Sequence, residues 1–228
     1  LQNALIEAVV ATNPNTVVVN NSGSPVAMPW LKRVPAMIQT WFAGQEFGNA
    51  LMDLITGKAN PSGKLPLTFP HRLEDTPAYT SYPGEFGKVH YGEGVFVGYR
   101  WYDTRDIEPL LPFGFGLSYT TFDISDLATD DADEIFTVRC TVTNTGDKVG
   151  QETVQVYVRP IDKTVARPEK ELKGFAKVNL KPGASKTLSI DLDSEAFSHW
   201  DIDAAAWQSA KGKYEIIVGN SSRDHRIS

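Results

Sequence analysis

The hydrophobic pattern of this chain changes its period near residue 119, and that change constrains the fold more than any other feature. Upstream, apolar residues recur at helical spacing or gather in short β-branched runs. Downstream, segments such as FTVRCTVTN (136–144) and ETVQVYV (152–158) alternate strictly between apolar and polar residues, which is typical of strands with one buried face. We therefore predict an α/β part followed by an all-β part.

The first part alternates helices with strands. Helical spacing over residues 1–10 is followed by the run TVVVN (16–20), which is typical of a parallel strand buried on both faces. A second strand is predicted over 36–42 and a second helix over 46–56. These elements predict a partial α/β sandwich with a mostly parallel sheet. About 60 residues are too few for a complete sheet of this kind. We therefore expect the missing strands upstream of Leu1, in a longer polypeptide of which this chain is the C-terminal portion.

The second part has the size and turn spacing of an immunoglobulin-like or fibronectin-type sandwich. Besides the two strands quoted above, strands are predicted near 172–178, 186–192 and 213–218, within a total of about seven. A long stretch rich in proline and glycine separates the two parts. The predicted domains are 1–70, the C-terminal half of an α/β sandwich domain; 71–119, a long loop and interdomain junction; and 120–228, a fibronectin type III-like domain.

Glycine and aromatic residues interleave most densely in the junction HYGEGVFVGYRWYDTRDIEPLLPFGFGLSYTTF (90–122). Carboxylates also crowd this segment, and glycosidases need two carboxyl groups roughly 5–10 Å apart. Acids in loops are nevertheless mostly solvated or ion-paired. The aromatic residues suit either interdomain packing or a sugar platform. Arg100, between Tyr99 and Trp101, suits an interdomain pin, a cation–π contact or a ligand contact.

Composition and motif spacing narrow the classes of function. The net charge of −6 gives no support to binding of nucleic acid or of an anionic membrane, and no run of 18 apolar residues is present. The four histidines are scattered, so no metal site is predicted. Motifs of the GxGxxG, GxxxxGK[ST] and GxSxG types are missing, so no cofactor is predicted. Cys140, the single cysteine, is interpreted as a buried, inert thiol.

Long motifs run through the chain in a fixed order. The first part contains NPNTVVVNNSGSPVAMPW, AGQE, GKANPSGKLPLTFP, YPGEFGKVHYGEGVFVGYRWYD and EPLLPFGFGLSYTTF. This order resembles the C-terminal part of the family-3 glycoside hydrolases, the β-glucosidase group. The later blocks VTNTGDKVGQETVQVYV, RPEKELKGFAKVNLKPGASKTLSIDL and GKYEIIVG resemble the fibronectin type III-like domain of that family. The resemblance covers the chain essentially from end to end.

The resemblance implies a retaining, exo-acting β-glycosidase, with a β-glucosidase acting on terminal non-reducing β-D-glucosyl residues as the first candidate. It places the catalytic aspartate in an N-terminal (β/α)8 barrel and the acid/base glutamate on a loop, both upstream of Leu1. No catalytic residue is therefore expected in this chain, and Glu46, Glu85 and Glu93 match positions associated with architecture. The expected partners are a β-glucoside or oligosaccharide, bound through the complete enzyme, and the barrel portion of the same protein.

Within this resemblance we expect the chain to supply scaffold and loops at the rim of the sugar site. The rim loops are residues 21–25 and 79–91, and the candidate substrate-binding residues are Asn21, Ser22 and Tyr91. Two alternatives stay open: a β-xylosidase of the same family, or a carbohydrate-binding or structural module without catalysis. The compartment is open, with a secreted or periplasmic location favoured over a cytoplasmic one. The junction is then interpreted as architecture and not as an active site.

Overall fold

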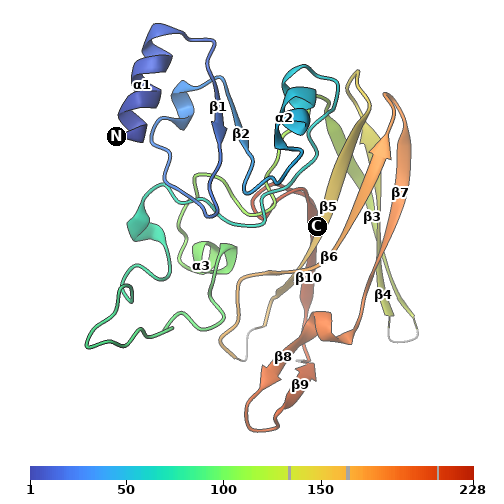
Figure 1. Cartoon of the computed structure of the whole chain (residues 1–228). Helices are drawn as coiled ribbons and strands as arrows, with labels where there is room; N and C mark the ends of the chain where they lie inside the picture. Colours follow the sequence, from blue (N-terminus) through green and yellow to red (C-terminus); the bar gives the residue numbers. More distant parts are fainter. Residues whose placement is uncertain (133–134, 163–164, 210) are drawn as a thin grey trace.

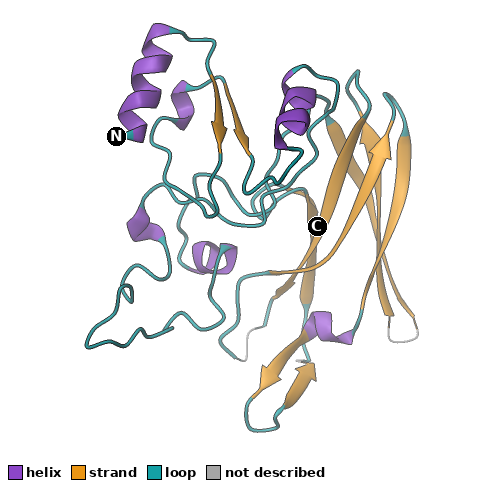
Figure 2. Ribbon diagram, in the orientation of Figure 1, coloured by secondary structure: helices purple, strands orange, loops and turns teal. Residues whose placement is uncertain are grey.

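A computed structural model describes residues 1–132, 135–162, 165–209 and 211–228. Figure 1 shows two parts side by side, a part with helices and long loops that contains the N-terminus and a β-sandwich that follows it. Figure 2 shows that helices and loops dominate the first part and long strands the second. The change of hydrophobic period in the sequence therefore marks a change of architecture.

In the first part, a pair of strands lies between helices. α1 (Gln2–Thr12) leads into β1 (Val17–Asn20), which pairs in parallel with β2 (Ala36–Gln39) over four residues. α2 (Phe47–Ile55) follows β2. The predicted helices and strands of this part are thus confirmed with small shifts of their ends. No helix among the described residues is both long enough and apolar enough to cross a membrane.

The predicted mostly parallel sheet is wrong. Among the described residues β1–β2 is the one parallel pair, and every other strand pairing is antiparallel. The expected burial of residues 16–20 on both faces is wrong as well, because Val17 is 45% exposed and the rest of β1 is half-buried. A parallel strand is buried on both faces only where helices cover both faces. The described residues of this part do not supply that cover.

A small core holds the first part together and reaches into the junction. Met28, Trp30 and Phe69 are almost fully buried, and the indole Nε1 of Trp30 donates a hydrogen bond to Asn3 Oδ1 of α1 at 3.0 Å. Phe69 also pairs with Leu111 through an isolated antiparallel bridge. The chain segment before the long loop is therefore tied to the segment after it.

Seven strands of the second part form two antiparallel sheets, with the orders β11-β10-β5-β6 and β3-β4-β7. Their bounds are β3 Phe122–Ala132, β4 Ile135–Asn144, β5 Gly150–Pro160, β6 Glu171–Leu180, β7 Ser185–Leu192, β10 Tyr214–Gly219 and β11 His225–Ile227. A separate hairpin, β8 (Ser198–Asp201) and β9 (Ala206–Ser209), extends from one end of the sandwich (Figure 1). The five strands quoted from the sequence are confirmed as β4, β5, β6, β7 and β10.

The core of the sandwich lies between these two sheets. Val138, Cys140 and Val142 of β4 pack with Val154 and Val156 of β5, and all five side chains are 0% exposed. Alternation along β4 sends its threonines and arginine outward, as the sequence pattern predicts. The interpretation of Cys140 as a buried thiol is confirmed, and burial raises the pKa of this thiol.

Candidate functional site

The turn at residues 21–25 begins where β1 ends, and its shape is held by polar side chains. Asn20 Nδ2 donates to Gln39 Oε1 at 2.6 Å and to Ser22 Oγ at 3.2 Å. The Ser22 hydroxyl in turn donates to the carbonyl of Ser24 at 2.9 Å. The side chain of Ser22 is thus occupied within the turn, whereas Asn21 is exposed. Of the two candidate rim residues in this turn, Asn21 is the one that is open to solvent.

An aromatic residue that the sequence pattern does not single out covers this turn. The ring of Phe42 lies against Gly23 so closely that any Cβ at that position would overlap it, yet the Phe42 side chain is 83% exposed. The preceding residue, Trp41, has a φ of 52°, a left-handed conformation that costs a non-glycine residue roughly 1–2 kcal/mol. Strained backbone of this kind clusters at active sites and ligand-binding loops. Phe42 therefore joins the candidate rim residues.

Tyr91 belongs to a different segment from Asn21 and Ser22, the loop of residues 76–98. This loop extends away from β1 and β2 (Figure 1). Among the described residues, no hydrogen bond, ion pair or ring contact joins Tyr91 to the turn. Three large aromatic side chains of the loop are at least 75% exposed: Tyr82 at 75%, Phe86 at 99% and Tyr91 at 84%. Phe86 also has a left-handed φ of 51°. The contacts of the described residues therefore do not join Tyr91 to Asn21 and Ser22.

Helix α3 (Tyr99–Thr104) holds both ends of this loop. The loop runs directly into α3 at its C-terminal end. At its N-terminal end, the indole Nε1 of Trp101 donates to the carbonyl of Asp75 at 3.1 Å. Arg72 bonds the Asp75 carboxylate at 2.7 Å and lowers its pKa. The cation over the Trp101 ring is Arg105, at 4.8 Å, and not the neighbouring Arg100.

The opposite face of α3 packs on the sandwich. Tyr99 stacks on Phe113 with centroids 4.9 Å apart and meets Tyr157 of β5 edge to face at 5.9 Å. The Tyr99 hydroxyl accepts a hydrogen bond from the backbone nitrogen of Leu172 in β6 at 2.8 Å. Arg100 pairs with Glu171 of β6 at 3.3 Å. Among the interpretations left open for the junction, interdomain packing and an interdomain pin are therefore the ones that the geometry supports.

A buried ion network also joins α3 to the sandwich. Asp103, with a side chain 5% exposed, accepts from Lys170 Nζ at 2.5 Å and from Arg223 Nε at 2.8 Å. Lys170 is 7% exposed, and burial lowers its pKa while the Asp103 carboxylate opposes that shift. Arg223 reaches further, to the carbonyl of Ile107 at 3.0 Å. One carboxylate of α3 thus meets cations from two separate segments of the sandwich.

A second set of interdomain contacts lies at residues 60–64. Asn60 Nδ2 donates to the carbonyl of Val149 at 3.0 Å. Lys64 forms an ion pair with Glu152 of β5 at 2.7 Å, and both side chains are largely buried. Lys177 of β6 donates to Ser62 Oγ at 2.9 Å. The two parts of the molecule are therefore fixed to each other by polar contacts on both sides of the aromatic packing.

The carboxylates of the junction are occupied in structural roles or face solvent. Asp103 and Asp75 are held by cations, as described above, while Glu74, Glu85 and Glu93 are exposed or half-buried in the loop. Among residues 1–132, 135–162, 165–209 and 211–228, no group of three His, Cys, Asp or Glu side chains is placed to hold a metal ion. This arrangement suits a scaffold better than a proton-transfer site.

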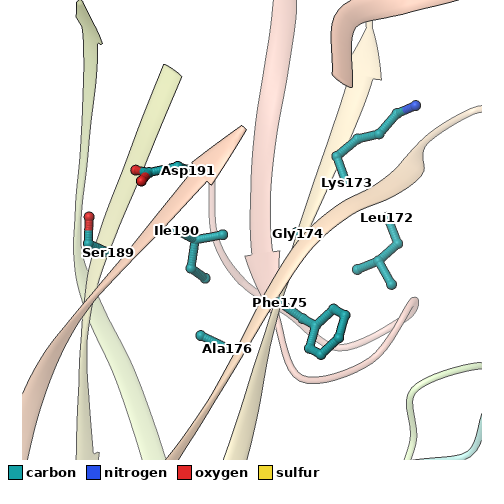
Figure 3. Close-up of a pocket in the computed structure, with 8 residues that line it drawn as sticks. All are labelled: Leu172, Lys173, Gly174, Phe175, Ala176, Ser189, Ile190 and Asp191. Carbon is teal, nitrogen blue, oxygen red and sulfur yellow. The ribbon is translucent and has the colours of Figure 1, made fainter. Parts of the chain in front are cut away.

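A groove lies on the sandwich, where the edge strands β6 and β7 face each other. It encloses about 390 Å³ and is lined by Phe175, Lys173, Ser189 and Asp191 among others. Figure 3 shows the ring of Phe175 and the carboxylate of Asp191 pointing away from each other. Ligand sites usually combine an apolar wall with convergent polar groups. The groove lacks that convergence.

Both parts of the chain are similar to known proteins. Residues 1–99 match the glycosyl hydrolase family 3 C-terminal domain, and residues 152–222 match a fibronectin type III-like domain. Thermostable β-glucosidase B of Acetivibrio thermocellus is 48% identical over 98% of this chain and 30% of its own length. An exo-α-(1→6)-L-arabinopyranosidase of Bifidobacterium breve is 50% identical, with the same coverage of 98% and 30%.

Solved structures agree with these sequence matches. The crystal structure of β-glucosidase from Kluyveromyces marxianus in complex with glucose superposes with a TM-score of 0.95 at 45% identity, over 99% of this chain and 27% of that one. The β-glucosidase of Bifidobacterium adolescentis gives 0.95 at 48% identity, over 99% and 34%. The chain spans less than a third of the length of the curated relatives described above. It belongs to glycoside hydrolase family 3 and corresponds to the C-terminal part of such an enzyme.

Proposed function

We propose that this chain is the C-terminal part of a retaining, exo-acting β-glucosidase that hydrolyses terminal non-reducing β-D-glucosyl residues. The observation that carries the proposal is the match of nearly the whole chain, at 48% identity, to a protein named as a β-glucosidase. A relative of equal similarity is named for an arabinopyranoside, so the sugar is not fixed by this part of the protein. β-Xylosidase activity is the alternative within the family. A substrate of oligosaccharide type favours a secreted or periplasmic location.

In this proposal, the chain supplies scaffold and the catalytic pair lies outside it. An upstream glutamate protonates the glycosidic oxygen while an upstream aspartate attacks the anomeric carbon and forms a glycosyl-enzyme. Water, deprotonated by the same glutamate, then releases the sugar. The supporting observation is that the buried carboxylates of the junction are engaged by Lys170, Arg223 and Arg72. They are not available for either step.

The proposed division is residues 1–70 as half of an α/β sandwich domain, 71–119 as loop and junction, and 120–228 as the fibronectin-like domain. A half-domain explains why apolar side chains of the first part are exposed: Leu5 by 64%, Phe42 by 83% and Met52 by 53%. We assign the Leu5 and Met52 surfaces to contact with the upstream half of this domain. Asn21, Ser22 and Tyr91, together with Phe42, are the proposed rim of the sugar site.

The isolated chain is expected to be inactive, and the complete enzyme active. Aryl β-glucoside, β-xyloside and α-L-arabinopyranoside would be assayed with the isolated chain, with an upstream fragment and with their mixture. We expect turnover only in the complete enzyme or in the mixture, and fastest on the β-glucoside. Turnover by the isolated chain would refute the placement of the catalytic pair. A complete enzyme that prefers the β-xyloside would establish the alternative.

One observation favours a second candidate function, carbohydrate binding by the sandwich. Trp200 of β8 and Trp207 of β9 are each 53% exposed and stand edge to face, 5.8 Å apart. Exposed indoles are a common sugar platform, although a cross-strand aromatic pair also stabilises a hairpin. Affinity electrophoresis in insoluble and soluble β-glucans would separate these roles. If the pair binds glucan, the complete enzyme is retarded and the variant Trp200→Ala/Trp207→Ala is not; if it only stabilises the hairpin, the two migrate alike.

A further inference from the structure

The 76–98 loop contains local turns, such as the one closed by the Glu85–Lys88 bridge, and both of its ends are held by α3. Three of its five large aromatic side chains, Tyr82, Phe86 and Tyr91, are at least 75% exposed. Its ends, in contrast, both meet α3: one through the hydrogen bond from Trp101 to the Asp75 carbonyl, the other by direct continuation of the chain. A movement of α3 therefore moves both ends of the loop together.

The position of α3 is in turn set by the sandwich. The helix has only six residues, too few to be stable without tertiary contacts. Tyr99 supplies the apolar contact and Asp103 the ionic one, with Lys170 immediately before β6 and Arg223 in the turn after β10. Both cations approach a carboxylate that is 5% exposed, so the pairing is little screened by water.

We propose that Asp103 is a positioning residue through which the fibronectin-like domain fixes the 76–98 loop and thereby sets the affinity of the enzyme for its glycoside substrate. The proposal rests on the proposed function, because it takes this loop as part of the rim of the sugar site. It gives the sandwich a role in substrate binding that needs no sugar contact by the sandwich itself. Asp103 acts through α3 and touches no substrate.

The test compares two buried interdomain ion pairs in the complete enzyme. Asp103→Asn removes the charge on α3 at constant shape. Glu152→Gln likewise removes the carboxylate charge from the Lys64–Glu152 ion pair, which joins the domains away from α3. We expect Asp103→Asn to raise KM about tenfold with kcat within about twofold, as expected when binding is lost equally in the ground and transition states. Glu152→Gln is expected to leave KM unchanged, whatever its effect on stability.

Hydrogen exchange of residues 76–98 provides a readout that requires no substrate. Exchange there is expected to be about tenfold faster in Asp103→Asn and unchanged in Glu152→Gln. Lys170→Met removes one of the two ion pairs of Asp103 and leaves the pair with Arg223, so it should raise KM less than Asp103→Asn, and the double variant should be no worse than Asp103→Asn alone. Equal KM changes in the Asp103 and Glu152 variants, or an unchanged exchange rate in Asp103→Asn, would overturn the proposal. If the enzyme acts on no β-glucoside, the exchange result still decides whether Asp103 holds the loop, so the two failures are distinguishable.

Discussion

Replacing Asn144 with alanine is expected to lower the free energy of unfolding of the sandwich by about 3 kcal/mol, one of the two largest effects that we expect from a single substitution. Asn144 ends β4 and is 0% exposed. Its Nδ2 donates to the carbonyls of Lys148 at 2.8 Å and Leu180 at 3.0 Å. Its Oδ1 accepts from Thr120 Oγ1 at 2.7 Å and from the backbone nitrogen of Gly146 at 3.1 Å.

The size of this effect follows from the four groups that lose their hydrogen bonds to the Asn144 side chain. A hydrogen bond between neutral groups contributes only about 1 kcal/mol, but a buried group left without a partner costs about 1–3 kcal/mol. Alanine at position 144 leaves the carbonyl of Leu180 and the hydroxyl of Thr120 unpaired in a largely buried region. Water can enter beside the Lys148 turn and recover part of the loss, which keeps the total near about 3 kcal/mol.

Asn179→Ala is the matched control, because Asn179 is an exposed asparagine on β6. Urea denaturation of the two variants, followed by near-ultraviolet circular dichroism, measures both free energies under one protocol. We expect Asn179→Ala to stay within about 0.5 kcal/mol of the unchanged protein. A difference of less than about 1 kcal/mol between the two variants would show that Asn144 does not hold this corner of the sandwich.

Asn144 shows which structural features can be predicted from the sequence alone and which cannot. The segment Asn-Thr-Gly-Asp is recognisable as a turn, and the alternation on either side predicts β4 and β5 correctly. The partners Thr120 and Leu180 lie 24 and 36 residues away. Local pattern carries no information on such distances, so a turn signal cannot reveal a buried side chain with four hydrogen bonds.

The incorrect expectations have the same physical origin. The apolar run at 16–20 predicts a strand, but its burial depends on what covers it. β3 is not predicted because five of its residues are acidic or serine and it bulges near Asp126, which has a φ of 56°. Likewise, the density of aromatic residues locates the joint, but the role of Asp103 depends on Lys170 and Arg223, which the fold brings from distant segments.

The candidate rim likewise contains one part that the sequence predicts and one residue that only the folded chain reveals. The end of a parallel strand is a sound place to expect ligand loops, and this expectation located the turn beside Asn21. Phe42 falls within a predicted strand and becomes a rim candidate only because Trp41 adopts a left-handed conformation and the Phe42 ring lies on Gly23. Exposure and backbone conformation, which decide this assignment, are properties of the folded chain.

Gly114→Ala is expected to destabilise the protein by about 3 kcal/mol, because both the backbone conformation and the space around this position are unsuited to a Cβ. Its φ is +80°, a left-handed value that costs alanine roughly 1–2 kcal/mol. An added Cβ would also overlap the side chain of Gln155, reaching within 2.7 Å of Nε2 and 2.8 Å of Cδ and overlapping Oε1 outright. That amide is 3% exposed and donates to the carbonyls of Asn220 at 2.8 Å and Gly114 at 3.2 Å.

Gly183→Ala isolates the backbone contribution, since Gly183 has a φ of +72° and no atom lies within 4 Å of the place that an added Cβ would occupy. We expect Gly183→Ala to cost about 1 kcal/mol, from the left-handed conformation alone. The further contribution of about 2 kcal/mol at Gly114 comes from displacing Gln155, whose Oε1 also accepts from the hydroxyl of Tyr157 at 2.6 Å. Removing that side chain should therefore relieve part of the damage: Gln155→Ala and Gly114→Ala together are expected to cost less than the sum of the two single changes. Additive free energies in this cycle would mean that the interdomain contact at Gly114 depends on the backbone alone.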